Sequence, residues 1–216
     1  MATDTYHLFS PYIDERYKAF SSRLSKTDTL PRLGIRIPQI RALSKGIDPD
    51  SIVPRFHEDV ILKGFAIGYS ALPYSEKLTK LSQMLDCLSS WDQTDTIQAA
   101  FRPKARERDE ALSFFMDLLL DDERVYPKRM AMVFLMSCRR LYCNEALLDA
   151  ILSHDDPEEY YISMAAAWAL ATFALDGIDA GEYRERVSEI TFRRAEQKLR
   201  DSLRKQKNRQ AYWNHP

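Results

Sequence analysis

The sequence predicts an all-α protein made of stacked helix pairs, and three observations lead to this fold class. Apolar residues recur every three or four positions through most of the 216 residues, which is the spacing of one helix face. Only 6 residues are glycine, fewer than the turns of a β-rich fold normally need. Alternating β-branched runs joined by Asn-Gly or Asp-Gly hairpins are missing. Helices are therefore expected throughout.

The expected helices follow one another with short breaks. The first carries Phe9, Ile13, Tyr17, Phe20 and Leu24 on one face. The second begins near Ile37, with Pro38 acceptable in its first turn, and Asp59 can cap the third, which carries apolar residues through 69. The remaining helices are expected at 75–88, 91–101, 105–120, 126–142, 144–152, 158–174, 181–190 and 191–207.

The lengths of these helices predict the architecture. Asp156-Pro157 and Asp176-Gly177 are clear breaks between them. About a dozen helices with a pair period near 40 residues are typical of HEAT-like repeats, antiparallel helix pairs that stack into a solenoid. We expect one such domain over residues 1–216, with a concave face that carries the function.

Cysteine and histidine usage argues against a disulfide framework and against a metal site. The cysteines Cys87, Cys138 and Cys143 are odd in number and lack Cys-x-x-Cys spacing, so reduced thiols are expected. The four histidines are isolated, and phosphate-loop and nucleophile-elbow motifs are missing. No metal and no cofactor are expected. Without a signal peptide or an apolar run of about 18 residues, a cytoplasmic protein away from the membrane is predicted.

Charge is distributed unevenly along the chain. The net charge is −1, yet the segment from Ile190 to the end carries eight Lys or Arg against two acidic residues and is therefore +6. A basic last helix of this kind can contact an anionic partner. Its alternative interpretation is a solvated final helix.

Several aromatic and charged residues are candidates for chemistry. Trp91 and Asp95 lie one helical turn apart, so an indole face and a carboxylate can attract a cation together. Alternatively, Asp92 or Asp95 only caps the helix. Trp168 ends an aromatic stripe that also fits a helix core, and Arg129 lies either at the surface or toward the concave face.

Glycine spacing indicates close helix packing at one place. Gly64 and Gly68 are separated by one turn within an apolar run. In a helix of a globular protein this spacing favours close approach of a neighbouring helix, not phosphate binding.

Several segments together resemble the bacterial DNA alkylation repair (AlkD-like) family. The segment 33–41 (Leu-Gly-Ile-Arg-Ile-Pro-Gln-Ile-Arg) with Lys45 resembles the opening motif of that family. The block 63–69, the Trp91-x-x-x-Asp95 motif, the helix 160–168 that ends in Ala-x-x-Trp, and the basic segment 193–207 are similar to later blocks, in order. The resemblance spans roughly residues 33–207.

The resemblance implies a fold, an activity and a set of site residues. The family forms a right-handed superhelix of HEAT-like repeats, and its active members excise cationic N3- and N7-alkylated purines from double-stranded DNA as DNA glycosylases. By motif position, Trp91, Trp168 and Asp95 line the lesion, and Arg129 contacts the DNA backbone. Further DNA-binding candidates are Arg41, Lys45, Arg193, Arg194 and Lys198. We expect a monomer that is nucleoid-associated when bound to DNA.

The sequence also departs from the active members of the family. They carry a second, aromatic and basic N-terminal helix before the Leu-Gly motif, whereas residues 21–31 here are polar and resemble a loop, as in a subgroup that lacks this helix. Ser163 and Met164 stand where active members tend to have basic residues. Two alternatives therefore stay open: a non-catalytic binder of DNA structures, and a HEAT-type protein-interaction scaffold.

Overall fold

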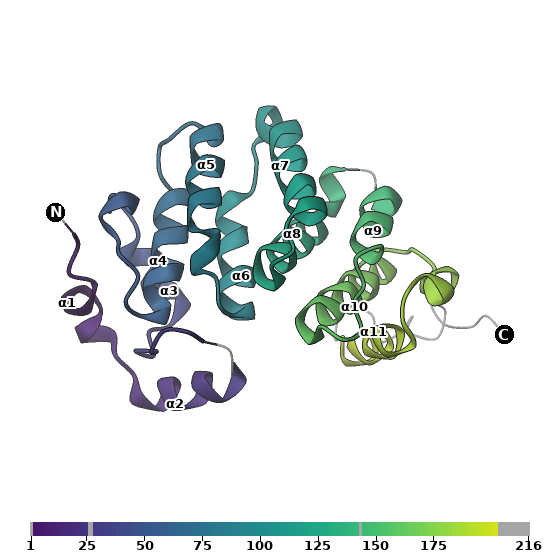
Figure 1. Ribbon diagram of the computed structural model, residues 1–216, viewed down its shortest axis with the longest axis horizontal. Coiled ribbons are helices and arrows are strands. Elements are labelled where there is room, and N and C mark those ends of the chain that lie inside the picture. The colour runs from purple at the N-terminus through teal and green to yellow at the C-terminus, as the bar shows by residue number, and fades with distance from the viewer. Residues whose placement is uncertain (1, 26–27, 143, 203–216) are drawn as a thin grey trace. The chain divides into compact units, whose positions relative to one another are not determined.

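The computed structural model describes residues 2–25, 28–142 and 144–202, and over these residues it contains helices and no β-strand (Figure 1). The predicted all-α class is confirmed. The chain forms two compact units, Met1–Phe114 and Phe115–Pro216, which are described one at a time. In each unit, successive helices pack against their neighbours in the chain, as in helical repeats. The single domain and the right-handed superhelix stay predictions.

The first unit has α4 at its centre, in contact with α3, α5 and α6. Its helices are α1 (Thr5–Phe9), α2 (Glu15–Leu24), α3 (Ile37–Leu43), α4 (His57–Gly68), α5 (Tyr74–Met84), α6 (Trp91–Ile97) and the start of α7 (Arg108–Asp121), with 3-10 turns at Ser10–Tyr12, Pro49–Ser51, Leu85–Cys87, Gln98–Phe101 and Ala105–Glu107.

Close packing against α4 depends on its two glycines. A Cβ on Gly64 would lie 2.6 Å from the Ile97 side chain, and one on Gly68 would lie 2.5 Å from Ala100 Cβ. Both distances are shorter than van der Waals contact, so only glycine lets α6 and the turn after it approach α4 this closely. The predicted role of the Gly-x-x-x-Gly spacing is confirmed.

The Leu-Gly-Ile segment before α3 wraps around a buried carboxylate of α4. Glu58 accepts hydrogen bonds from the backbone N–H groups of Leu33 (3.0 Å), Gly34 (2.7 Å) and Ile35 (3.3 Å). Gly34 has φ +85°, and a Cβ there would lie 2.5 Å from the Asp14 carbonyl oxygen. Glycine is required here both by the left-handed backbone and by the approach of α2.

The N-terminal helix prediction is wrong in two respects. The face from Phe9 to Leu24 does not belong to one helix, because Pro11 lies in a 3-10 turn and Ile13 has extended backbone. Phe20 and Leu24 of this face are 56% and 51% exposed. In addition, α2 continues to Leu24, so the stretch expected as a loop from residue 21 begins only at Ser25.

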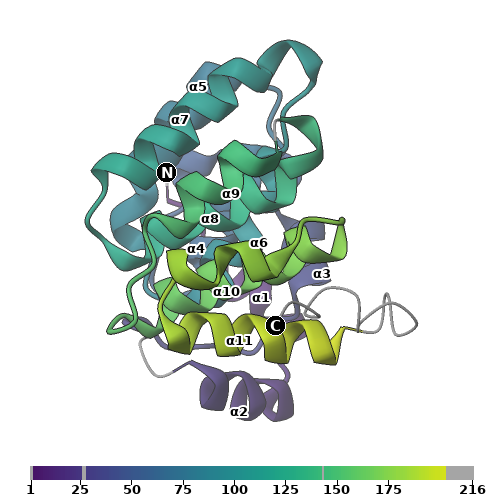
Figure 2. The same cartoon turned by 90° about the vertical axis from the view of Figure 1, so that its right-hand side faces the viewer.

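The second unit is built around α10. Its helices are the end of α7, α8 (Val125–Cys138), α9 (Asn144–Leu152), α10 (Tyr160–Leu175) and α11 (Glu189–Asp201), with 3-10 segments at Arg139–Leu141 and Ala180–Arg186. Figure 2 shows these helices, and α10 contacts α8, α9 and α11. Six alanines of α10 are buried, which lets its neighbours approach on several sides.

The C-terminal helices differ from the prediction at their ends. Residues 181–190 were expected as an α-helix, but Ala180–Arg186 is a 3-10 segment and α11 begins at Glu189. The basic helix expected over 191–207 ends at Asp201, because Ser202 has extended backbone. Arg204, Lys205, Lys207 and Arg209 of the basic tail lie outside the described residues. Within the described part of the chain, no helix is long and apolar enough to span a membrane.

Candidate active site

The candidate residues of the first unit lie together at the start of α6. Trp91 and Asp95 are one turn apart on this helix, and both side chains are half-buried. The indole Nε1 of Trp91 donates to the Leu24 carbonyl oxygen at 3.3 Å, which ties the ring to the end of α2. Thr94 Oγ1 donates to the Trp91 carbonyl oxygen at 2.8 Å and lies 3.1 Å from Asp95 Oδ1. An indole and a carboxylate so placed can serve a cationic ligand.

Asp92 has a different role from Asp95, although it is adjacent to Trp91. Its two carboxylate oxygens accept from the Arg32 guanidinium at 2.8 and 3.1 Å. The same guanidinium donates to both oxygens of Asp28. Because Arg32 is only 8% exposed, this double pairing is nearly dry. Asp92 therefore anchors α6 to the segment before the Leu-Gly motif.

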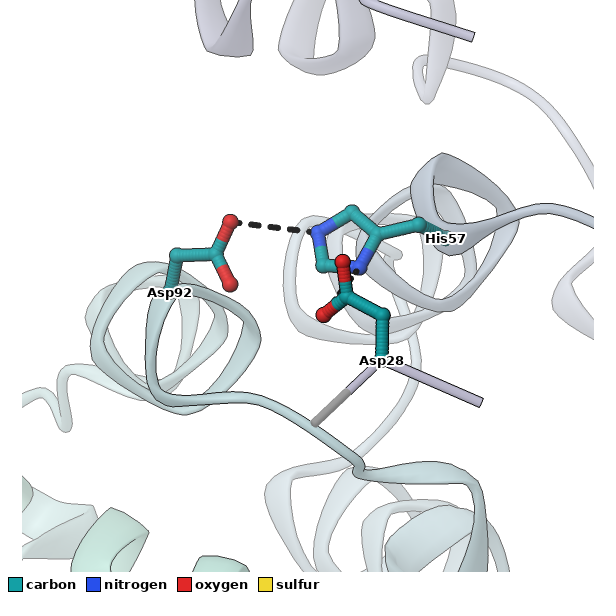
Figure 3. A group of neighbouring side chains, drawn as sticks. All are labelled: Asp28, His57 and Asp92. Carbon is teal, nitrogen blue, oxygen red and sulfur yellow. Dashed lines mark ion pairs between the residues drawn. The ribbon is translucent and has the colours of Figure 1, made fainter. Parts of the chain in front are cut away.

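His57 completes this buried ion-pair cluster (Figure 3). Gln93 Oε1 accepts the Ser89 N–H at 2.9 Å, so the Gln93 amide nitrogen faces His57 Nδ1 at 3.1 Å. His57 Nε2 lies 3.2 Å from Asp92 Oδ2, and Nδ1 lies 3.6 Å from Asp28 Oδ1. The ring thus supports Asp92 from the side opposite to its helix.

Asp28, His57 and Asp92 have the residue types of a metal site, with ligand atoms within 4.8 Å of one another. Arg32 already donates to all four of the carboxylate oxygens. Gln93 engages Nδ1 of the histidine. A metal ion would have to displace these donors, so the arrangement fits an ion-pair cluster better than a metal centre.

The pKa values of the cluster report strong pairing. Burial acts to raise the pKa of the Asp92 carboxyl, but His57 and Arg32 outweigh it and hold that pKa well below its usual range. Burial acts to lower the pKa of Arg32, but the hydrogen bonds to Asp28 and Asp92 outweigh this effect and raise that pKa above its usual value. Both groups stay charged across the physiological range, which keeps the start of α6 fixed.

The other candidates of the first unit lie on or near α3. Arg41 is exposed and its guanidinium lies 5.3 Å from the Phe65 ring centroid and 6.0 Å from that of Tyr69. Lys45 is exposed just after the helix. Both cations are accessible to an anionic partner.

In the second unit, α11 places cations over aromatic rings of α10. The Lys198 ammonium lies 5.6 Å from the Trp168 ring centroid, and the Arg194 guanidinium lies 4.9 Å from that of Tyr160. Trp168 is 36% exposed and Tyr160 is 53% exposed. Trp168 is therefore more than a core residue, and its indole face already attracts a cation.

Arg194 is held in place by a chain of hydroxyl groups. It donates to Ser163 Oγ at 2.6 Å. Ser163 Oγ contacts Thr191 Oγ1, whose own proton goes to Asp155 Oδ1 at 2.6 Å. Ser163 therefore donates to Thr191 and accepts from Arg194. Residues 163 and 164 are not basic, but Arg194 of α11 places a cation beside Ser163.

Two further DNA-binding candidates already have intramolecular partners. Arg129 is 6% exposed and donates to the Tyr161 carbonyl oxygen at 2.7 Å, which links α8 to α10. Arg193 is exposed and pairs with Glu189 at 2.7 Å. Arg129 is therefore buried between α8 and α10, and its role as a DNA contact stays a prediction.

The structure thus brings the candidates together in two groups, Trp91 with Asp95 and Trp168 with Lys198 and Arg194. The meeting of the two groups on one concave surface stays a prediction. Sequence patterns missed the pairing of Arg32 with Asp92, of His57 with Gln93 and of Ser163 with Arg194, because these partners are 60, 36 and 31 positions apart in the chain.

Comparison with known proteins decides the family. A family model described as DNA alkylation repair enzyme matches residues 7–204. The chain belongs to this family. Neither the comparison with curated proteins nor that with solved structures found a match. Family membership supports a role in DNA alkylation repair, in agreement with the motifs found in the sequence.

Proposed function

We propose that this DNA alkylation repair family member is a DNA glycosylase that excises cationic N3- and N7-alkylated purines from double-stranded DNA. The observation that carries the proposal is the pair Trp91 and Asp95 on α6. Asp95 lies one helical turn after Trp91 on α6, whereas the Asp92 carboxylate pairs with Arg32. The second candidate function is DNA binding without catalysis, and the test below distinguishes it from the first.

The chemistry requires few protein groups. Alkylation makes the purine cationic, so the base can leave with the bonding electrons of its C1′–N bond as a neutral molecule. Positive charge develops on the sugar as this bond breaks, and a carboxylate stabilises it. Water adds its oxygen to C1′ and loses a proton. In this proposal Asp95 stabilises the sugar cation and orients the water.

The two indoles act on the charge of the substrate. Trp91 and Trp168 attract a cationic nucleotide through their ring faces without selecting a particular base. The Lys198 ammonium lies 5.6 Å from the Trp168 ring centroid, so a cationic nucleotide would take its place over the ring and leave Lys198 to a phosphate. Arg194, Lys198, Arg41 and Lys45 then face phosphates. The protein acts as a monomer, in the cytoplasm at the nucleoid.

The test is base release from 7-methylguanine DNA by the purified protein. Asp95→Asn keeps the shape and removes the charge, so release should fall by about 10²–10³. Binding of undamaged DNA should not weaken, because a carboxylate repels phosphate and its loss removes no attractive contact to the DNA backbone. Asp117→Asn, at an exposed position of α7, is the matched control and should keep full activity.

The outcomes separate the three functions. Equal release by the wild type and Asp95→Asn would remove Asp95 from the mechanism. A wild-type protein that binds DNA and releases no base would replace the glycosylase by a non-catalytic DNA binder. No DNA binding even at low salt would leave the interaction scaffold, because phosphate contacts are strongest there.

A further inference from the structure

A cavity with a basic lining lies in the first unit, at the opposite end of α6 from Trp91. It has a volume of about 610 Å³ and is formed by the connection from α4 to α5 and the two 3-10 turns that follow α6. Trp91 begins α6, whereas Ala99 and Ala100, which line the cavity, follow its end. Nine residues of helix separate the two places, roughly 13 Å.

The lining carries far more positive than negative charge. Lys77, Arg102, Lys104 and Arg106 contribute four cations, and Glu107 is the acidic residue among them. The cavity therefore has a charge of +3 in a chain whose net charge is −1. Such a local excess attracts anions against the average charge of the protein.

The acidic residue does not neutralise this group. Glu107 Oε2 accepts the Lys104 backbone N–H at 2.8 Å and so holds the turn in place. Its Oε1 lies 3.7 Å from Arg106 Nε, and that arginine side chain is 81% exposed, so the pair is weak. Among the described residues, neither Arg102 nor the Lys104 ammonium has a carboxylate partner.

One cation is set into the wall. Lys77 Nζ donates to the Gly68 carbonyl oxygen at 3.0 Å, and its two other protons are available to a ligand. Burial lowers the pKa of Lys77, and the positive charge of Lys104 lowers it further, against the opposing effect of Glu107. An anion bound in the cavity would stabilise this partly buried ammonium group.

The walls of the cavity are fixed by the fold. Tyr74 donates its hydroxyl proton to the Phe101 carbonyl oxygen at 2.6 Å, which joins the start of α5 to the turn after α6. The close contact of Gly68 with Ala100 also holds the end of α4 against the turn that follows α6. A preformed cavity costs a ligand little ordering of the protein.

We propose that this cavity binds a small organic molecule with a di- or triphosphate group. A carboxylate brings one negative charge, whereas a phosphate monoester brings about 1.5–2 and a diphosphate more, which matches the excess of +3 better. Two guanidinium groups suit the geometry of phosphate oxygens. The volume falls within the range of about 300–1,000 Å³ usual for small-molecule sites. Tyr69 lines the cavity with a 43% exposed ring, which can contact a planar organic part.

The test is calorimetric titration of the full-length protein with ADP and, separately, with inorganic pyrophosphate. The double variant Arg102→Gln/Lys104→Gln should weaken binding of both probes roughly tenfold or more. The double variant Arg16→Gln/Arg23→Gln removes the same charge from exposed positions of α2 and should bind both probes like the wild type. Thermal melts of both variants check that the fold is kept.

The site is independent of the proposed glycosylase, so Asp95→Asn should bind both probes unchanged. No binding of either probe by the wild type would overturn the proposal. Equal weakening by both double variants would overturn it as well, since it would show general electrostatic attraction. A parallel titration with duplex DNA tests whether the cavity binds the phosphates of DNA instead of a small molecule. If Arg102→Gln/Lys104→Gln loses only DNA affinity, the cavity rim contacts the DNA backbone and the small-molecule proposal fails.

Discussion

The two units hold their candidate site helices by different polar clusters. In the first, Arg32 pairs directly with two carboxylates, and all the charges are in contact. In the second, Arg194 and Asp155 are separated by the hydroxyls of Ser163 and Thr191. When one charge of a direct ion-pair cluster is removed, the opposite charges lose their partner and the free energy of unfolding falls strongly. In a hydroxyl chain the stabilisation comes from several hydrogen bonds between neutral groups, so the loss of one group costs less. The first kind should therefore be more sensitive to mutation and to pH.

The largest effect is expected for Arg32→Met. The variant leaves the half-buried carboxylates of Asp28 and Asp92 without their buried cation, which should cost up to about 3–5 kcal/mol in the free energy of unfolding. Urea denaturation followed by circular dichroism measures this. Arg36→Met removes an exposed pair with Asp14 in the same unit and should cost under about 1 kcal/mol. Similar costs for the two variants would mean that the Arg32 cluster is not a buried ion-pair cluster.

The pH dependence of stability sharpens the same contrast. The pKa of Asp92 lies below its unfolded value of 3.8, so its stabilisation is complete above that value and is lost as the pH falls through it toward the folded pKa. The cost of Arg32→Met should therefore shrink between about pH 7 and about pH 3, because protonation of Asp92 removes its need for a cation. Urea denaturation of both proteins across this range is the measurement. A cost independent of pH would contradict the assignment.

A smaller effect is expected for the hydroxyl chain. Ser163→Ala removes the acceptor of Arg194 and the donor to Thr191, which should cost about 1–3 kcal/mol. The loss should be nearly independent of pH below neutrality, since no carboxylate loses a direct cation. Ser153→Ala, at an exposed position that bonds only a local carbonyl, should change stability little. If Ser163→Ala and Ser153→Ala have the same free energy of unfolding, the chain of hydroxyl groups contributes nothing to stability.

The smallest effect is expected where a cation lies over a ring at the surface. The contact of Lys198 with Trp168 should be worth about 0.5–1 kcal/mol. A double-mutant cycle with Lys198→Met and Trp168→Leu isolates that coupling from the burial lost by each change. A coupling of zero would show that the two side chains are only neighbours.

Local pattern predicted that Trp91 and Asp95 lie on one helix, and α6 carries both. Trp91 and Asp95 share a face because four residues make about one helical turn, and this holds wherever the helix packs. The same argument failed between Phe9 and Leu24, where Pro11 interrupts the helix and the apolar side chains of α2 face solvent. Periodicity predicts a face, but only packing decides whether that face is buried.

The sequence by itself determined the all-helical class, the close approach at Gly64 and Gly68, and the pairing of Trp91 with Asp95. All of these depend on residues within a few turns of one another. Only the tertiary structure decided that Asp92 is an anchor and that Ser163 receives a cation. Their partners Arg32 and Arg194 lie 60 and 31 positions away. The physical reason is that charge pairing depends on distance in space, and spacing along the chain does not specify which distant groups the packed helices bring together.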